Sequence, residues 1–130
     1  MSRILAVDDE PHILKLVSFS LRSGGFDVVE AADGLSAIDI AAAEQPDLIL
    51  MDVMMPALDG YEACRRIKAN PATADIPIVM LSAKTQKAEQ AEGLSAGAMD
   101  FICKPFTPKE LVAQVRVLLG EEPEPDGKGA

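Results

Sequence analysis

Residues 48–52 read LILMD, four apolar residues that run directly into Asp52. Three other short apolar runs stop at polar residues in the same way: residues 4–7 at Asp8 and Asp9, residues 78–81 at Ser82, and residues 101–103 at Lys104. If the four runs are parallel strands of one sheet, their carboxyl ends lie along one edge, where open α/β sheets bind ligands. The sequence therefore predicts a site that holds three carboxylates, a hydroxyl and an ammonium group.

The three carboxylates of this site indicate a metal. Asp8, Asp9 and Asp52 would repel one another unless a cation lay among them. Carboxylate oxygens are hard ligands of the kind that Mg²⁺ prefers, and a metal beside these groups suits phosphoryl transfer. Asp8 and Asp9 could instead simply cap a helix that starts at Pro11, but capping explains neither Asp52 nor Lys104.

Strand-like and helix-like segments alternate five times along the chain. Apolar residues recur at helical spacing from Pro11 until Gly24 and Gly25 end the first helix. The later units are a strand at 26–30 with an alanine-rich helix, the strand at 48–51 with a helix after Gly60, the strand at 78–81 with a helix near 86–96, and the strand at 101–103 with a helix after Pro108. This pattern predicts an α/β fold, a flavodoxin-like (βα)5 doubly wound parallel sheet of strand order 2-1-3-4-5 in a single domain.

The helix near residues 86–96 has the thinnest apolar stripe of the five. It offers only Ala88, Ala91 and Leu94 to a core. Because an element that buries little apolar surface opens at low cost, we expect this helix to be the one most easily displaced.

Composition excludes several classes of function. The chain has 130 residues, 48% of them hydrophobic, which suits one domain with a full core. A net charge of −9 argues against direct binding to nucleic acid or to an anionic membrane. No apolar run approaches the ~20 residues of a membrane span, and residues 1–3 lead into a strand rather than a signal peptide. We expect a reduced, cytoplasmic protein in which Cys64 and Cys103 are buried thiols.

The motifs at the strand ends and turns carry a family pattern. They are the acidic pair Asp8-Asp9, residues 50–56 (LMDVMMP), Asp59-Gly60, residues 81–83 (LSA), residues 97–101 (GAMDF) and residues 104–106 (KPF). In this order and spacing, residues 1–119 resemble the receiver domain of two-component response regulators, the CheY-like superfamily. The remaining residues, 120–130, are rich in acids, Pro and Gly and read as a disordered tail or a truncated linker.

The resemblance implies a signalling switch with a bound metal. Asp52 would accept a phosphoryl group from a histidine kinase or a phosphotransfer protein. Asp9 and Asp52 would ligate Mg²⁺ directly, Asp8 would act mostly through water, and the backbone carbonyl of Met54 would supply a further ligand.

The resemblance also assigns the phosphate contacts. Lys104 would pair with one phosphoryl oxygen and Ser82 would donate a hydrogen bond to another. Backbone amides of Val53 and Ala83 would complete the phosphate site. The Lys104–Pro105 bond would be cis, which aims the lysine.

Phosphorylation is expected to change the face formed by the fourth helix, the fifth strand and the fifth helix. Ser82 would move toward the phosphate and the ring of Phe101 would rotate into the space that it leaves. This face would control an unknown output domain or partner. Asp100 and Arg116 fit the charge pairs through which some family members dimerise, so a phosphorylation-dependent homodimer stays open.

Two other functions stay open at this point. One is a Mg²⁺-dependent phosphohydrolase with Asp52 as a turnover nucleophile, although such enzymes usually carry a second acid two residues further on, where this chain has Met54. The other is a receiver-like interaction module that is never phosphorylated, against which the intact acids and Lys104 argue. On the main interpretation the chain is not an enzyme, apart from self-phosphorylation and slow autodephosphorylation.

Overall fold

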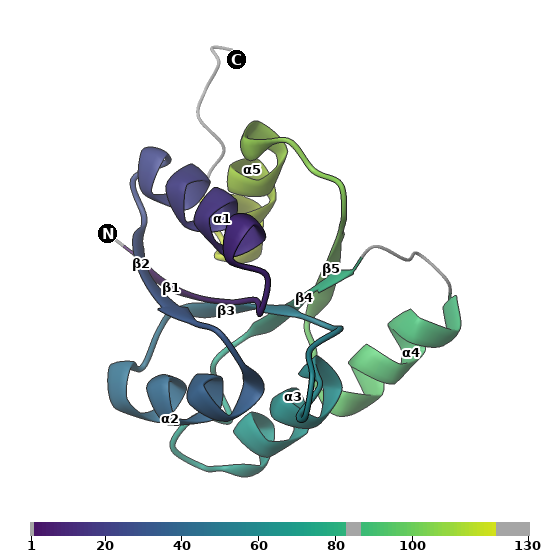
Figure 1. Ribbon diagram of the computed structural model, residues 1–130. Helices are drawn as coiled ribbons and strands as arrows, with labels where there is room; N and C mark the ends of the chain where they lie inside the picture. Colours follow the sequence, from purple (N-terminus) through teal and green to yellow (C-terminus); the bar gives the residue numbers. More distant parts are fainter. Residues whose placement is uncertain (1, 83–86, 122–130) are drawn as a thin grey trace.

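Figure 1 shows the computed structural model, in which five parallel strands form one sheet with helices on both faces. The structure describes residues 2–82 and 87–121, and of residues 87–90 only the backbone. The elements are β1 (Arg3–Val7), α1 (Pro11–Ser23), β2 (Asp27–Ala31), α2 (Gly34–Glu44), β3 (Leu48–Asp52), α3 (Gly60–Ala69), β4 (Ile78–Ser82), α4 (Lys87–Ala96), β5 (Asp100–Cys103) and α5 (Pro108–Leu118). The strand order β2-β1-β3-β4-β5 confirms the predicted flavodoxin-like fold.

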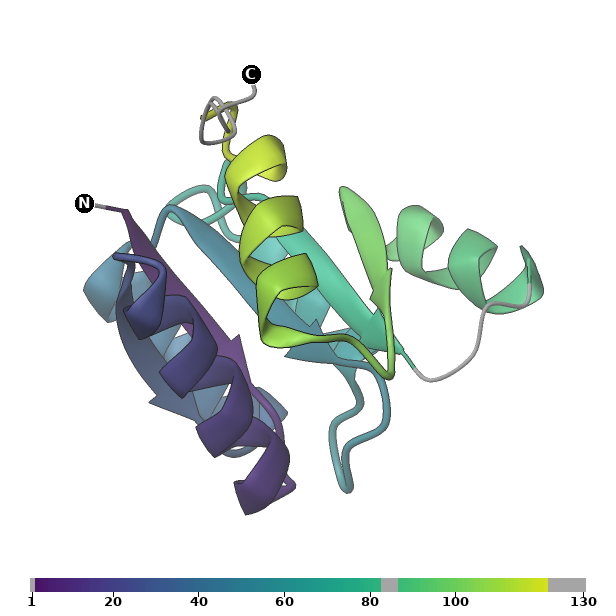
Figure 2. The ribbon, with the colours of Figure 1, turned by 90° about the horizontal axis from the view of Figure 1, so that it is seen from above.

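The sheet separates two hydrophobic layers. α1 and α5 lie on one face, where Val17 and Leu21 pack with Leu111 and Val115. α2 and α3 cover the other face and α4 lies beside α3 (Figure 1), while Figure 2, seen from above, shows α1 and α5 in front of the sheet. β3 and β4 are buried along their whole length because helices cover both of their faces. The core therefore fixes the central strands, and with them the residues at their carboxyl ends.

Side chains at the helix starts explain where the helices begin. Asp33 accepts a hydrogen bond from the backbone of Ser36, and Asp59 accepts one from Glu62, so each carboxylate satisfies an amide in the first turn. Thr107 makes a full capping box at the start of α5. These caps set the entry of α2, α3 and α5 into the fold.

Two expectations about burial are wrong. Cys103 is exposed, because β5 is an edge strand and buries only Ile102 fully. In α4, Ala91 and Leu94 are exposed, whereas Gly93 and Ala96 are the buried residues of its described side chains, 91–96. The side chain of Ala88 lies outside the described residues. The second strand also starts one residue later than predicted, at Asp27.

The ends of the described chain meet at the amino edge of the sheet. The Ser2 hydroxyl donates a hydrogen bond to the Glu121 carboxylate at 3.0 Å, and Arg3 forms ion pairs with Asp27 and Glu44. Of the predicted tail, 120–130, the structure describes only Gly120 and Glu121. Among the described residues, no helix combines the length and the apolar character that a membrane span requires.

Candidate functional site

The topology brings the predicted site residues to one edge of the sheet. β1 and β3 are neighbours and Val7 lies opposite Met51, so the residues that follow in each strand, Asp8 and Asp52, lie side by side. β4 and β5 continue the sheet beyond β3, and Lys104 follows the end of β5 directly. Residues 52 positions apart are thereby brought within hydrogen-bond distance.

Three carboxylates form the centre of this edge. One oxygen from each of Asp8, Asp9 and Asp52 lies within 4.8 Å of the others. Asp8 is 2% exposed and Asp52 is 7% exposed, whereas Asp9 faces solvent. The backbone amide of Glu10 donates to one oxygen of Asp8 at 2.9 Å, which fixes that carboxylate in place. The cluster offers hard oxygen ligands to a cation that approaches from the solvent side.

Lys104 is the cation that faces these acids. Its ammonium nitrogen lies 3.0 Å from Oδ1 of Asp52 and 3.4 Å from Oδ2 of Asp8. The backbone also holds the lysine, because the Lys104 amide donates to the Ser82 carbonyl at 2.8 Å. The Lys104–Pro105 bond is cis. One ammonium group thus bridges the two most buried carboxylates of the site.

The pKa values of this pair reflect burial and charge together. Burial raises the pKa of Asp52 above its ordinary value, the hydrogen bond from Lys104 opposes that rise, and the Asp8 charge adds to it. For Lys104, burial lowers the pKa, but the hydrogen bond to Asp52 and the charges of Asp52 and Asp8 outweigh it, so the pKa is raised. The lysine therefore stays charged. Its charge partly offsets the effect of burial on Asp52 by favouring the ionised carboxylate.

The remaining predicted contacts lie around this centre. Ser82 ends β4 and is buried. The amide of Val53 donates to the Leu81 carbonyl at 3.1 Å, so that this donor already has a partner. The Met54 side chain is 76% exposed, which leaves its backbone as the part able to serve a metal site. Ala83 lies outside the described residues.

Two glycines shape the loop that follows Asp52, a role that sequence reasoning missed. A Cβ atom on Gly60 would overlap with the Asp52 carbonyl oxygen, and one on Gly34 would lie 2.8 Å from the Leu58 carbonyl oxygen. The loop at residues 53–59 is therefore held between the first turns of two helices. The sequence signal was present twice, since in each case a capping Asp precedes the Gly.

Phe101 connects this edge of the sheet to α4. It lies opposite Met80 in the β4–β5 pair and is half-buried. Its ring lies against Gly93, where any Cβ atom would overlap with the ring. Arg116, in contrast, turns away from this face, because its guanidinium donates to the Gly24 carbonyl at 2.7 Å and stacks over Phe26. In this structure the Arg116 side chain thus contacts Gly24 and Phe26, and the expected use of Asp100 and Arg116 in a dimer stays a prediction.

Known proteins share this architecture. The family profile described as "Response regulator receiver domain" matches residues 4–116. Among curated proteins, the DNA-binding dual master transcriptional regulator RpaA of Synechocystis sp. is 44% identical over 119 residues, 92% of this chain and 49% of its own length. The chain thus spans about half the length of the curated relatives it matches.

Solved structures agree with the sequence matches. The chemotaxis response regulator CheY4 of Vibrio cholerae has a TM-score of 0.86 and 34% identity, over 91% of this chain and 98% of its own. The receiver domain of the sensor histidine kinase PA1611 from Pseudomonas aeruginosa PAO1, described with a magnesium ion coordinated in its active site cleft, has a TM-score of 0.85 and 36% identity, over 92% of this chain and 98% of its own. With its fold, its carboxylate edge and these relatives, the chain belongs to the family of response regulator receiver domains.

Proposed function

We propose that this receiver domain is switched by phosphorylation of Asp52, with a histidine kinase or a phosphotransfer protein as donor. The observation that carries the proposal is the 3.0 Å contact between Lys104 and Asp52 beside two further acids. A carboxylate oxygen of Asp52 forms a bond to phosphorus while the bond from phosphorus to the imidazole nitrogen of the donor breaks. The leaving imidazole keeps the electron pair of that bond and takes up a proton.

Lys104 prepares Asp52 for this reaction. The ionised carboxylate is the attacking form, and burial alone would favour the neutral acid. The hydrogen bond from the ammonium group favours the ionised form. The same positive charge lies where it can pair with a phosphoryl oxygen once the group has been transferred.

The acid cluster fits Mg²⁺ by its chemistry, because its donors are carboxylate oxygens and one of them is open to solvent. Asp9 and Asp52 would hold the ion directly, with the Met54 carbonyl as a third ligand and Asp8 acting through water. When bound, the ion supplies positive charge that neutralises the phosphoryl oxygens during transfer. The magnesium ion described in the PA1611 receiver domain supports this choice of metal.

Three further groups would contact the phosphoryl oxygens: the Ser82 hydroxyl and the amides of Val53 and Ala83. Ser82 suits this role because it ends the strand next to β3. The Val53 amide would have to exchange its present bond to the Leu81 carbonyl for one to the phosphate. Val53 is therefore the weaker of the proposed contacts.

The output surface that we propose is the face of α4, β5 and α5. Leu94, Met99 and Val117 are exposed there, with 50–61% of each side chain in solvent. Exposed apolar side chains of this size suit a partner protein, an attached domain or a second copy of the chain. A homodimer on this face could use these apolar residues, and Arg116 would have to give up its hydrogen bond to the Gly24 carbonyl before it could join a charge pair.

We propose no nucleic-acid contact for these residues. RpaA is described as DNA-binding, but this chain covers about half of that protein. With a net charge of −9 the present chain offers no positive field for DNA, so we propose that it contacts no nucleic acid directly. We further propose that it works in the cytoplasm, where a kinase has access to it.

The phosphohydrolase alternative lacks a proton donor. Such an enzyme needs an acid near the nucleophile to protonate its leaving group. Two residues past Asp52 the chain has Met54, whose side chain points into solvent. We therefore propose self-phosphorylation and slow hydrolysis of the aspartyl phosphate, without turnover of a second substrate.

Mass spectrometry after treatment with acetyl phosphate and Mg²⁺ tests the acceptor. The wild-type chain is expected to gain about 80 Da, the mass of one phosphoryl group, on a peptide that contains Asp52. Asp52→Asn removes the nucleophile at constant shape and should gain nothing, whereas the control Asp59→Asn, at the exposed cap of α3, should still be labelled. Labelling of Asp52→Asn to the wild-type extent would overturn the assignment, and release of phosphate without any labelled intermediate would favour the hydrolase.

A further inference from the structure

The described side chains of α4, those of residues 91–96, make few apolar contacts. Of residues 91–96, only Gly93 and Ala96 are buried, and both are small. Leu94 leaves 54% of its side chain in solvent. Apolar burial of this size contributes little free energy, so polar contacts weigh more in fixing this helix than in fixing the others.

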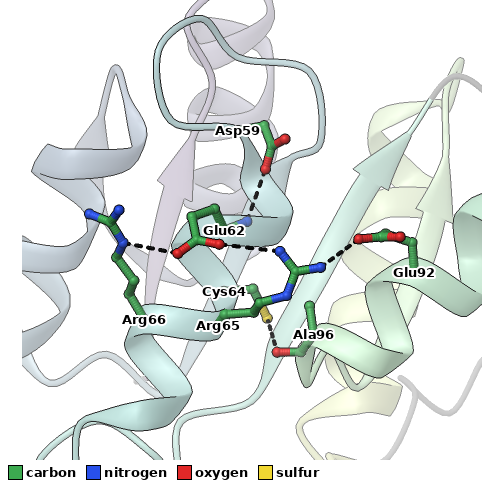
Figure 3. A network of polar contacts seen from close by, with 7 residues as sticks. All are labelled: Asp59, Glu62, Cys64, Arg65, Arg66, Glu92 and Ala96. Carbon is green, nitrogen blue, oxygen red and sulfur yellow. Dashed lines mark hydrogen bonds and ion pairs between the residues drawn. The ribbon is translucent and has the colours of Figure 1, made fainter.

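Two such contacts join α4 to α3 (Figure 3). The guanidinium of Arg65 donates to the Glu92 carboxylate at 2.5 Å, and the buried thiol of Cys64 donates to the Ala96 carbonyl at 3.4 Å. Glu92 and Ala96 are one helical turn apart, so the two contacts attach one side of α4 to α3 at two points. We call these two contacts the α3–α4 latch.

The α3 side of the latch is itself braced. Glu62 forms ion pairs with Arg65 at 3.3 Å and with Arg66 at 3.1 Å, and its amide donates to the capping carboxylate of Asp59 at 2.9 Å. Gly60, next to that cap, lies against the backbone carbonyl of Asp52. The first residue of the helix that carries Arg65 therefore lies next to the backbone of the proposed phosphoacceptor.

The part of α4 that carries Glu92 also contacts the ring of Phe101. Gly93, beside Glu92, is the residue on which the Phe101 ring lies. α4 cannot move away from α3 without opening the Arg65–Glu92 pair and also changing the surface under that ring. The latch and the ring contact thus stabilise one and the same position of α4.

We propose that the α3–α4 latch is an autoinhibitory contact, and that Arg65 is a positioning residue that keeps α4 and Phe101 in the unphosphorylated arrangement. The inference rests on the proposed function, since it adds a restraint on the switch that Asp52 operates. By linkage, a contact present only in the unphosphorylated arrangement lowers the affinity for a phosphoryl group by the factor by which it favours that arrangement. Loosening the latch therefore makes the switch easier to turn on.

Arg65 and Arg66 provide a matched pair for the test. Both are exposed and both form an ion pair with Glu62, but of the two it is Arg65 that contacts a described side chain of α4, that of Glu92. In titrations of beryllofluoride, a phosphoryl mimic, with Mg²⁺, Arg65→Gln and Glu92→Gln should each raise the affinity about 1.5- to 5-fold, the range that an exposed ion pair supports. Arg66→Gln should leave it unchanged, and Arg65→Lys should stay close to wild type.

The double variant Arg65→Gln, Glu92→Gln should resemble either single variant, because both remove one shared interaction. High salt should reduce the differences by screening the pair. The proposed role of the latch is wrong if Arg66→Gln has the same effect as Arg65→Gln. It is also wrong if the two single effects add in the double variant, or if all variants match the wild type.

Hydrogen exchange separates this proposal from the proposed function. Without any phosphoryl mimic, Arg65→Gln should raise the exchange rates of amides at 91–96 about 1.5- to 5-fold, while those of α1 and all those in Arg66→Gln stay at wild-type rates. If the wild type bound no beryllofluoride, the proposed function would fail and this measurement would still decide on the latch. Unchanged exchange in α4 of Arg65→Gln would overturn the latch even if Asp52 were phosphorylated normally.

Discussion

Cys64 shows how burial sets the chemistry of one residue. The thiol has no exposed surface and donates to the Ala96 carbonyl. Burial raises its pKa from an ordinary 9.0 to about 11, although the charges of Lys68 and Arg65 lower it in part. The folded protein thus keeps the proton over a pH range in which the unfolded chain loses it.

This pKa predicts a loss of stability in alkaline solution. The Cys64 contribution is fully present below pH 9.0 and falls as the pH rises toward about 11, because only the unfolded state then ionises the thiol. Urea unfolding of the wild type and of Cys64→Ala over this range measures the effect. The free energy of unfolding should fall more steeply with pH in the wild type, and parallel curves for the two proteins would contradict the prediction.

Ser18 and Ser20 make a second comparison at the residue scale. Both are buried in α1, but Ser20 donates to the Leu16 carbonyl at 2.7 Å, whereas the Ser18 hydroxyl has no hydrogen-bond partner among the described residues. A buried hydroxyl without a partner costs about 1–3 kcal/mol. Ser18→Ala should therefore raise the free energy of unfolding by about 1 kcal/mol, as measured by chemical denaturation.

Ser20→Ala is the control for this prediction. It makes the same change in the same helix, so helix propensity contributes equally to both variants. It removes a hydrogen bond that is already made, and stability should stay level or fall by about 1 kcal/mol. Equal gains in the two variants would show that propensity, and not the unpaired hydroxyl, governs the result.

At the scale of elements, β4, β5 and α4 connect the candidate site to the proposed output face. Ser82 ends β4, and Phe101 in β5 lies on Gly93 of α4. Beryllofluoride with Mg²⁺ should shift the amide resonances of α4, β5 and α5 and leave those of α1 nearly unchanged, because Ser82 and Phe101 connect the site to that face and not to α1. Shifts confined to the loops around Asp52 would refute the coupling.

Ser82→Ala isolates the role of the hydroxyl in this path. The hydroxyl would contact the phosphate after transfer and takes no part in bond formation, so Asp52 should still be phosphorylated. The shifts at Phe101 should be at most half of those in the wild type under the same conditions, a proportion on the order of what one lost hydrogen bond of ~1 kcal/mol allows. Wild-type shifts at Phe101 would exclude Ser82 from the path.

The helices and strands also show what sequence patterns can specify. Apolar runs predicted the strands well, since β3 and β4 are covered on both faces and uniform burial needs uniform side chains. The pattern failed at the edge of the sheet, where Cys103 belongs to a strand with one open side. It failed again in α4, where close packing selects the small residues Gly93 and Ala96 over the larger Leu94.

For the whole molecule, a metal at the acid cluster predicts a gain in stability on binding. Mg²⁺ that binds only the folded state should raise the melting temperature with increasing concentration. The variant Asp9→Ala, Asp52→Ala should lose this dependence. In metal-free buffer it should melt at or above the wild-type temperature, because fewer acids repel one another there. An equal rise of the melting temperature with Mg²⁺ in both proteins would contradict the assignment of the metal site.

The candidate site was more predictable as a whole than its surroundings. Strand order alone places Asp8, Asp52 and Lys104 together, because the ends of parallel strands share one edge. The ion pair of Arg65 with Glu92 could not be predicted. The two residues are 27 positions apart, and their contact depends on how α3 and α4 pack against each other. The direction of Arg116 was missed for the same reason, because only the packing of α5 against α1 reveals its carbonyl partner.

The bond between Ser2 and Glu121 has a consequence for engineering. Residues 2 and 121 therefore lie side by side at one end of the domain, while the proposed reactive edge lies at the carboxyl ends of the strands. Because its ends lie close together, the domain could be inserted into a surface loop of another protein with little distortion of either partner. A circular permutant that joins these two residues through a short linker, with new ends cut elsewhere, leaves the proposed phosphorylation site unchanged.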